Sequence, residues 1–378
     1  MDASATFLFA GGGTGGHLFP GIAVAEKLRS RDSTTRIIFV GSTRAIESSI
    51  IAEHDIEHRM LPVEPLTTLK PNPVRFAVQN WRAWRQAGAL LSELRPDAVI
   101  GLGGFASAPI VLAARRQRIP IILLEQNVIP GRTTRWLCHY ATKVCVSFEE
   151  TCVKLPRARS VVVTGNPVRA EIAILHDRGT LESSPPHSSM TKPELLILGG
   201  SQGADSLNDA VLLAIRKIRN SVAGWNVVHQ AGPRQVEHVR QAYEQLGLTA
   251  KVEPFFHDLP NRYSNANLVI SRAGATTLAE LACAGVAMIL LPYPYAADDH
   301  QRANAQAFVD HSAAVIVNHA SVAESTADEL SLAMRQLVGD GERRLIMGLA
   351  AGRLARPRAT GEIADVIIEA ARRSIDRS

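Results

Sequence analysis

The feature that most constrains this chain is a repeated unit, in which an apolar strand runs into a glycine-rich turn and then a helix. The first copy opens the chain: residues 6–10 are apolar, and residues 11–16 read GGGTGG. The second copy has an apolar run at 195–198, GGSQG at 199–203 and apolar side chains at helical spacing over 207–218. A strand that enters a helix through glycines is typical of the start of a parallel βαβ unit. Two copies in separate halves predict two such domains.

Strand-like apolar runs alternate with helical segments along both halves. In the first half these runs cover residues 6–10, 36–40, 98–102, 121–124, 143–146 and 161–164. In the second half they cover residues 195–198, 226–229, 251–254, 268–270, 287–291 and 314–317. Strands that alternate with helices form parallel sheets with helices on both faces. We therefore predict an α/β fold class with two Rossmann-like, doubly wound parallel-sheet domains that face one another across a cleft.

The expected domain boundaries follow from length and from one stretch of loop composition. A chain of 378 residues is too long for one typical domain and suits two. Residues 176–193 are rich in Ser, Pro and His, which marks a loop. The expected parts are an N-terminal domain over 1–165, a C-terminal domain over 166–345, and helices over 346–378, broken at Arg356-Pro357, that pack back towards the first domain. Because ligands bind beyond the carboxyl ends of parallel strands, we expect the active site between the two domains.

Composition excludes several classes of protein. The 41 basic and 36 acidic side chains leave a net charge of +5, and no RNA-binding or helix-turn-helix pattern stands out, so we expect no nucleic-acid partner. No apolar run approaches the ~18 residues of a membrane span, and residues 1–10 lack the basic start of a signal peptide. The four cysteines form no CxxC pair and are expected to be reduced and structural. These features predict a cytoplasmic globular protein.

The first glycine-rich turn carries the GxGxxG spacing at positions 11, 13 and 16 and is followed by His17. A NAD site would need an acid at the end of the second strand, which ends Val40-Gly41-Ser42, although Arg44 would suit NADP. Five glycines in six positions let a polar ligand approach backbone N–H groups closely. We favour a phosphate or sugar site, while a purely structural turn and a dinucleotide site stay open. His17 is the best-placed general base of such a site, or a residue that only orders the turn.

Two segments of the second half also suit phosphate groups. The turn at 199–203 adds the hydroxyl of Ser201 to the N–H groups of the helix that follows it. Small residues with Thr276 and Thr277 open another helix after the strand at 268–270. Glu280 lies one turn inside that helix. Its carboxylate can accept two hydrogen bonds from ribose hydroxyls, or it is a surface glutamate that favours the helix dipole.

Polar motifs also follow strands in the first half, whereas several catalytic motifs are missing from the sequence. Glu125-Gln126-Asn127 follows an apolar strand, and GNPVR at 165–169 stands at the domain junction. Both either point at the cleft or serve as hinge and salt-bridge residues. HExxH, GxxxxGK[ST], GxSxG and Asp-x-Asp do not occur. His54 and His58 are four residues apart but are not expected to bind a metal ion, so we predict no metal site and no cofactor.

Seven stretches of the chain are specific when taken together: GGGTGGHLFPGIAVA, GLGGFAS, EQN, GNPVR, LGGSQGA, SRAGATTLAEL and DDHQRANA, which span residues 11 to 305. In these stretches the chain resembles the bacterial UDP-N-acetylglucosamine transferases that form lipid II of peptidoglycan. Other two-domain UDP-sugar transferases, such as plant galactolipid synthases, share only part of the set. One departure is Leu124, because the family usually has a histidine before EQN, and this removes one candidate base.

The resemblance implies a fold and an activity. It implies the GT-B fold and an inverting, metal-independent transfer of N-acetylglucosamine from UDP-GlcNAc to the C4 hydroxyl of the muramyl residue of lipid I, the undecaprenyl-diphosphate-linked muramyl pentapeptide. The implied processes are peptidoglycan synthesis, cell-wall biogenesis, cell shape, cell division and the cell cycle. Three alternatives stay open: another UDP-sugar-dependent GT-B transferase with a lipid acceptor, an NADP-dependent oxidoreductase, and a non-enzymatic nucleotide-sugar sensor.

Carried over residue by residue, the resemblance also implies a substrate site. In the first domain, Thr14, Gly15 and Gly16 would border the sugar and the acceptor. Asn127 and Arg169 would reach the donor from the first domain and the domain junction. In the second domain, Ser201 would meet the diphosphate, and the backbone of Phe256 would read the uracil. The phosphates and the ribose would be held by Ala275, Thr276, Thr277 and Glu280. Gln301 would contact the sugar hydroxyls. The catalytic residue expected beside them is His17.

Residues 69–93 are predicted to contain a helix with an apolar stripe. The stripe either packs against the domain or faces lipid. Four basic residues accompany it, namely Lys70, Arg75, Arg82 and Arg85. Such a surface suits anionic lipid headgroups. We therefore expect a peripheral protein on the cytoplasmic face of the inner membrane, bound to its anionic inner leaflet, and the family adds other cell-wall synthesis and division proteins as expected partners.

Overall fold

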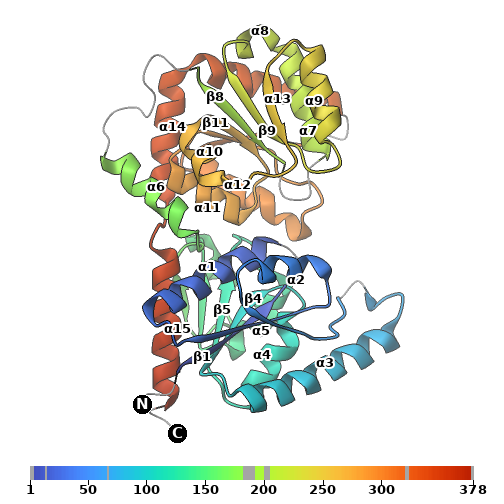
Figure 1. Ribbon diagram of the computed structural model, residues 1–378, viewed down its shortest axis with the longest axis vertical. Helices are drawn as coiled ribbons and strands as arrows, with labels where there is room; N and C mark the ends of the chain where they lie inside the picture. Colours follow the sequence, from blue (N-terminus) through green and yellow to red (C-terminus); the bar gives the residue numbers. More distant parts are fainter. Residues whose placement is uncertain are drawn as a thin grey trace. The chain divides into compact units, whose positions relative to one another are not determined.

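The computed structural model describes residues 4–12, 15–65, 68–181, 192–199, 205–319 and 323–375. The chain forms two compact units (Figure 1). The first unit contains Met1–Arg169 and Arg358–Ser378, and the second contains Ala170–Pro357. The chain therefore passes into the second unit after Arg169 and returns to the first after Pro357. The domain boundaries expected at 165/166 and 345/346 stay predictions.

The first unit is a parallel sheet. In its described part the sheet has seven strands in the order β3-β2-β1-β4-β5-β6-β7. They are β1 (Thr6–Gly11), β2 (Arg36–Gly41), β3 (Glu57–Met60), β4 (Ala98–Gly103), β5 (Ile121–Glu125), β6 (Lys143–Val146) and β7 (Val161–Val163). Neighbouring strands pair in parallel. The order reverses at β1 and β4, and the carboxyl ends of these two strands are where such sheets bind ligands.

Helices cover both faces of this sheet. They are α1 (Gly15–Arg31), α2 (Ala45–Ala52), α3 (Pro73–Leu94), α4 (Ser107–Arg116), α5 (Arg132–Leu137) and α15 (Ala359–Ile375), with the 3₁₀ helices η2 (Cys138–Tyr140) and η3 (Glu149–Lys154). On one face α1 and α15 lie side by side, and Ile22 and Ile367 share their core (Figure 1). On the other face α3 and α4 contribute Leu91 and Ile110. Because β4 is covered on both sides, all six of its residues are buried, which explains its continuous apolar run.

The second unit repeats this architecture. Its described strands form a six-stranded parallel sheet in the order β10-β9-β8-β11-β12-β13. They are β8 (Glu194–Leu198), β9 (Asn226–Gln230), β10 (Ala250–Glu253), β11 (Ala266–Ser271), β12 (Met288–Leu290) and β13 (Ala314–Ile316). The helices are α6 (Ala170–Leu181), α7 (Asp205–Lys217), α8 (Arg219–Val222), α9 (Val236–Gln245), α10 (Leu259–Asn265), α11 (Ala275–Ala284), α12 (His300–Val309), α13 (Ala323–Gly339) and α14 (Gly341–Leu354), with the 3₁₀ helix η4 (Ala297–Asp299). Here the strand order reverses at β8 and β11.

The structure confirms the α/β class and the two doubly wound parallel sheets. It adds β3, which the sequence did not reveal because EHRM at a sheet edge has no apolar alternation. The break expected at Arg356-Pro357 is confirmed, since α14 ends before it and α15 begins after it. Of residues 346–378, α15 packs in the first unit, whereas α14 packs against α11 in the second, where a Cβ on Gly348 would lie 2.3 Å from the Gly285 carbonyl oxygen. Within the described ranges, no helix is long and apolar enough to cross a membrane.

Candidate functional site

The first glycine-rich turn is described at its two ends. β1 ends at Gly11 and α1 begins at Gly15. Thr14, which we expected beside the sugar, lies outside the described residues together with Gly13. Gly16 is exposed in the first turn of α1. The turn therefore presents the start of α1, and with it the predicted base, at the carboxyl end of β1.

A buried carboxylate lies directly against this turn. Glu47, in the first turn of α2, is 0% exposed and accepts hydrogen bonds from the Ser42 amide (2.8 Å) and the Ser42 hydroxyl (2.7 Å). A Cβ on Gly12 would lie 2.3 Å from Glu47 Oε2. Because a carboxylate repels a phosphate at short range, this position disfavours the dinucleotide interpretation. Glu47 was not among the residues predicted from the sequence, where the only sign was an acid in the helix after the second strand.

His17 is oriented by a side chain from the end of another strand. Its Nδ1 lies 3.2 Å from Oε1 of Gln126, the residue that follows β5. Because an amide oxygen only accepts, this contact favours the tautomer of the neutral imidazole that carries its proton on Nδ1 and has its lone pair on Nε2. Gly103, with a φ of 89°, lies close to the ring, since a Cβ there would be 3.3 Å from His17 Cε1. The arrangement leaves Nε2 as the atom that can take up a proton.

The three residues of the Glu125-Gln126-Asn127 motif have different roles. The Glu125 carboxylate is buried and accepts hydrogen bonds from the Asn127 amide (3.1 Å), the Asn127 side chain (3.3 Å) and the Gly131 amide (2.9 Å), so it holds the loop. Asn127 is half-buried and fixed by that contact. Gln126 is 3% exposed, and its Nε2 has no hydrogen-bond partner within the described structure. Gln126, which we had not chosen as a site residue, is thus the member of the motif that touches His17.

In the second unit, four predicted residues lie on α11. Gly274 begins the helix without a side-chain cap, and the first turn contains Ala275, Thr276 and Thr277 but no acid. No acidic side chain in this turn therefore opposes an anion, which the dipole of the helix favours at this end. Glu280 is only 7% exposed, so it is not the surface glutamate that the sequence left open. Its Oε2 accepts a hydrogen bond of 2.8 Å from the hydroxyl of Tyr263 in α10.

A half-buried guanidinium lies at the carboxyl end of β11. Arg272 donates to the carbonyl oxygens of Leu291 (2.9 Å) and Pro292 (3.3 Å) and to the Ser206 hydroxyl in α7 (2.7 Å). No carboxylate of the described residues forms an ion pair with it, and burial lowers the pKa of Arg272 to about 10. A cation in this position attracts an anionic ligand. Arg272 belongs to one of the motifs of the sequence, but no pattern there indicated that it is half-buried without an acidic partner among the described residues.

Two further predicted residues already have contacts that limit what they can bind. The Phe256 amide donates to Oε1 of buried Gln230 at the end of β9 (3.1 Å), so the Phe256 carbonyl is the backbone group left for a base. Gln301, in the first turn of α12, accepts a hydrogen bond from the Tyr293 amide (2.9 Å) through Oε1. Its Nε2 is therefore the part of that side chain that can donate to a sugar hydroxyl.

The remaining predicted residues are less closely defined. Ser201 lies outside the described residues, as does most of the second glycine-rich turn. Arg169 is half-buried at the last position of the first unit, directly before α6. In the part of the chain that the structure describes, no group of three or more His, Cys, Asp or Glu side chains is arranged to hold a metal ion. The roles of all these residues stay predictions.

Family models match both halves of the chain. The glycosyltransferase family 28 N-terminal domain matches residues 7–146, and the glycosyltransferase family 28 C-terminal domain matches residues 194–351. The chain is 38% identical to a protein of Geotalea uraniireducens, over 96% of both chains, and 39% identical to one of Anaeromyxobacter sp. (strain K), over 97% of this chain and 93% of the relative. Both relatives are named UDP-N-acetylglucosamine--N-acetylmuramyl-(pentapeptide) pyrophosphoryl-undecaprenol N-acetylglucosamine transferase.

Solved structures give the same result. MurG of Acinetobacter baumannii has a TM-score of 0.75 and 30% sequence identity, and the match covers 97% of this chain and 99% of that chain. The UDP-GlcNAc 2-epimerase of Neisseria meningitidis, bound to UDP-GlcNAc, has a TM-score of 0.66 at 14% identity, over 97% of this chain and 100% of that chain. The second likeness is one of fold alone.

Proposed function

Because the chain belongs to the glycosyltransferase family 28 transferases that add N-acetylglucosamine to N-acetylmuramyl-(pentapeptide) pyrophosphoryl-undecaprenol, we propose that it transfers N-acetylglucosamine from UDP-GlcNAc to lipid I. The transferase is a hexosyltransferase of the GT-B fold, and its product is lipid II. The acceptor is the C4 hydroxyl of the muramyl residue. The reaction belongs to peptidoglycan synthesis. We propose that the protein thereby contributes to cell shape and cell division, and that other cell-wall proteins are its partners.

The observation that carries the donor half of this proposal is the end of α11. An uncapped helix N-terminus attracts a diphosphate, and a carboxylate one turn further in can accept hydrogen bonds from ribose hydroxyls. Both features lie on one helix, so one nucleoside diphosphate can engage them together. Arg272 supplies a positive charge at the end of the strand that leads into α11. These groups offset the charge that develops on UDP as it leaves, which is the work a metal ion does elsewhere.

The observation that carries the acceptor half is the imidazole of His17. In an inverting transfer the acceptor oxygen attacks the anomeric carbon, the bond from that carbon to the UDP oxygen breaks, and the acceptor hydroxyl loses its proton. Nε2 of His17 takes up that proton, since Gln126 holds the proton of Nδ1. We accordingly propose the second unit as the donor domain and the first as the acceptor domain.

Transfer itself is the first test. The protein should convert UDP-GlcNAc and lipid I to a disaccharide product, detected by mass spectrometry, while UDP-glucose and UDP-galactose should react far more slowly. Equal or better use of another UDP-sugar would favour the alternative of a different GT-B transferase. Binding of NADPH in place of UDP would instead support an oxidoreductase.

The ribose role of Glu280 has a separate test. Replacing Glu280 by alanine removes hydrogen bonds to a charged acceptor, which costs roughly 1.5–3 kcal/mol of UDP affinity. Isothermal titration with UDP measures this directly. Unchanged affinity in a folded variant would exclude the ribose role and leave the diphosphate site on α11 to be tested alone.

We also propose that α3 docks the protein on anionic membrane. The apolar stripe consists of Val74, Ala77, Val78, Trp81, Trp84, Gly88 and Leu91, and the alternatives left open by the sequence divide along it. Leu91 is buried, whereas the earlier part of the stripe is exposed, with Trp81 54% accessible and Val74 more so. A half-exposed apolar stripe beside basic residues is typical of an interfacial helix. The exposed half is therefore the candidate membrane face.

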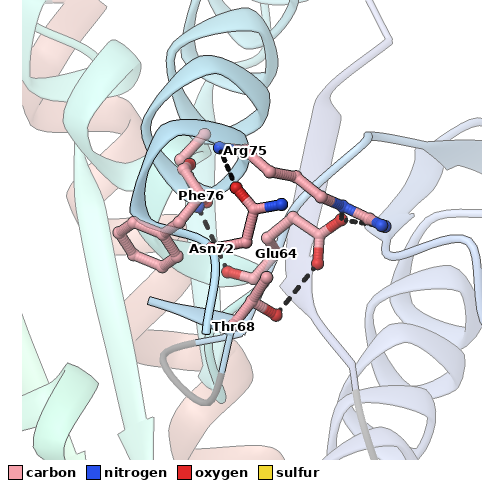
Figure 2. Close-up of polar contacts among 6 residues, drawn as sticks. Glu64, Thr68, Asn72, Arg75 and Phe76 are labelled. Carbon is pink, nitrogen blue, oxygen red and sulfur yellow. Dashed lines mark hydrogen bonds and ion pairs between the residues drawn. The ribbon is translucent and has the colours of Figure 1, made fainter. Parts of the chain in front are cut away.

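The contacts of Arg75 support leaving this residue out of the proposed membrane face. Arg75 forms an ion pair with Glu64, with 2.6 Å between Nη2 and Oε1, and Glu64 also accepts a hydrogen bond from Thr68 (Figure 2). Asn72 caps α3 by accepting a hydrogen bond from the Arg75 amide (Figure 2). Arg75 therefore holds the start of the helix, and its charge is offset. Arg85 keeps its charge and lies over the Trp81 ring, 5.1 Å from its centroid.

Vesicle co-sedimentation tests the docking. A Lys70/Arg82/Arg85→Ser variant should lose about 1 kcal/mol of binding per residue on vesicles that contain phosphatidylglycerol. The matched control is Arg216/Arg219/Arg335→Ser, which removes three exposed charges from the second unit and should bind like wild type. High salt should weaken wild-type binding, because the Debye length falls to about 3 Å at 1 M. Equal loss in both variants would mean a general charge effect and no docking face on α3.

A further inference from the structure

The carboxylate of Glu280 is held by a tyrosine that belongs to a different helix. Tyr263, in α10, is 2% exposed, and its hydroxyl donates to Glu280 Oε2 at 2.8 Å. Both groups are buried, so water does not compete with this hydrogen bond as it would at the surface. Neither the glycine-rich turns nor the helix pattern around Tyr263 pointed to this contact.

The hydrogen bond fixes the plane of the carboxylate. The last torsion of a glutamate side chain is broad, so an unsupported carboxylate samples many orientations. A donor bound to Oε2 selects one of them and takes up one of the roughly four acceptor sites of the group. The other sites, including those of Oε1, then point in defined directions. Two neighbouring hydroxyls on a sugar ring need two acceptors in a fixed relation, which is what an oriented carboxylate supplies.

We propose that Tyr263 is a positioning residue that aims the Glu280 carboxylate at the 2′- and 3′-hydroxyls of the nucleotide, and that it thereby makes the donor site selective for ribonucleotides over 2′-deoxyribonucleotides. This inference rests on the proposed ribose role of Glu280. Tyr263 does not touch the nucleotide and acts through Glu280. Its loss therefore affects the ligand that carries the 2′-hydroxyl much more than the ligand that lacks it.

The test compares UDP with 2′-deoxy-UDP in isothermal titration. Tyr263→Phe removes one oxygen atom and keeps the ring that fills the core. We expect UDP affinity to fall roughly tenfold, since a hydrogen bond to a charged group is disturbed. The affinity for 2′-deoxy-UDP should change less than about twofold, so the ratio of the two affinities falls. An equal loss for both nucleotides, or an unchanged ratio, would overturn the inference.

Two further variants separate the possible causes. Tyr243→Phe is the matched control, because Tyr243 is equally buried in the same unit and its hydroxyl lies 3.0 Å from His229 Nδ1. It should lower the melting temperature and leave the nucleotide ratio unchanged. Glu280→Gln tests the premise: if it and the wild type both fail to distinguish UDP from 2′-deoxy-UDP, the proposed ribose role is wrong. If Glu280→Gln removes the discrimination and Tyr263→Phe does not, only the role of Tyr263 is wrong.

Discussion

Replacing Gly12 by alanine should damage both the stability of the first unit and its catalysis. The added Cβ would lie 2.3 Å from Oε2, 2.5 Å from Cδ and 2.6 Å from Oε1 of Glu47, all far inside van der Waals contact. The carboxylate cannot move aside freely, because Ser42 binds both of its oxygens. Breaking those hydrogen bonds costs about 1.5–3 kcal/mol each, whereas shifting the turn costs about 1–3 kcal/mol. The turn should therefore move, and with it His17, the proposed general base. A shift of about 1 Å in the position of such a base costs about 10²-fold in rate.

The assay for Gly12→Ala combines thermal unfolding, lipid II formation and UDP titration. We expect lower stability and much slower turnover with unchanged UDP affinity, since the proposed donor site lies in the other unit. Gly88→Ala is the matched control: nothing lies within 4 Å of a Cβ there, in the middle of α3, so it should stabilise the unit by about 0.5–1 kcal/mol. Adding Glu47→Ala to Gly12→Ala should recover at least about 1 kcal/mol relative to the sum of the single variants. If the two changes simply add, the carboxylate is not what makes glycine necessary.

Three other outcomes follow from the structure. His17→Ala should lose about 10²–10⁴-fold in kcat while UDP binding persists, and a loss confined to the KM for lipid I would make it a positioning residue instead. Turnover should continue in excess EDTA, and complete loss that magnesium restores would contradict the proposed neutralisation by helix ends and Arg272. Burial lowers the pKa of His229 to about 3, so only the unfolded chain takes up a proton there as the pH falls from 6.5 towards 3. Unfolding free energy should therefore drop by about 2 kcal/mol between pH 7 and pH 5, as followed by urea titration, and a His229→Gln variant with the same drop would refute this assignment.

The fold was predictable from the sequence because its determinants are local and repeated. Buried parallel strands read as short apolar runs, and glycines mark both reversal points of strand order, so the two sheets follow from the pattern alone. β3 escaped prediction because an edge strand needs no apolar face. The spacing of the stripe on α3 could not show whether it faces the core or lipid, since apolar residues recur with the same period on both kinds of surface.

The site was predictable only where all the residues of a motif lie on one helix or turn, so that their spacing in the sequence sets their positions in space. Glu280 and the threonines of α11 share one helix, so their spacing already places them together. The partners that orient the chemistry are tertiary: Gln126 is 109 positions from His17, and Tyr263 stands on a separate helix from Glu280. No period or motif relates such residues. The lack of an acidic partner for half-buried Arg272 among the described residues is likewise a property of the packed structure.

The return of α15 to the first unit has a consequence for how the protein is made. Ile363 and Ile367 fill the core beneath α1, yet they are synthesised only after the whole of the second unit, Ala170–Pro357. Domains generally fold as units while the chain grows from its N-terminus. Here the first unit cannot close until α15 has been synthesised, whereas the continuous second unit has its whole sequence earlier. A chain cut short before α15 would therefore leave the unit that was made first with an open core.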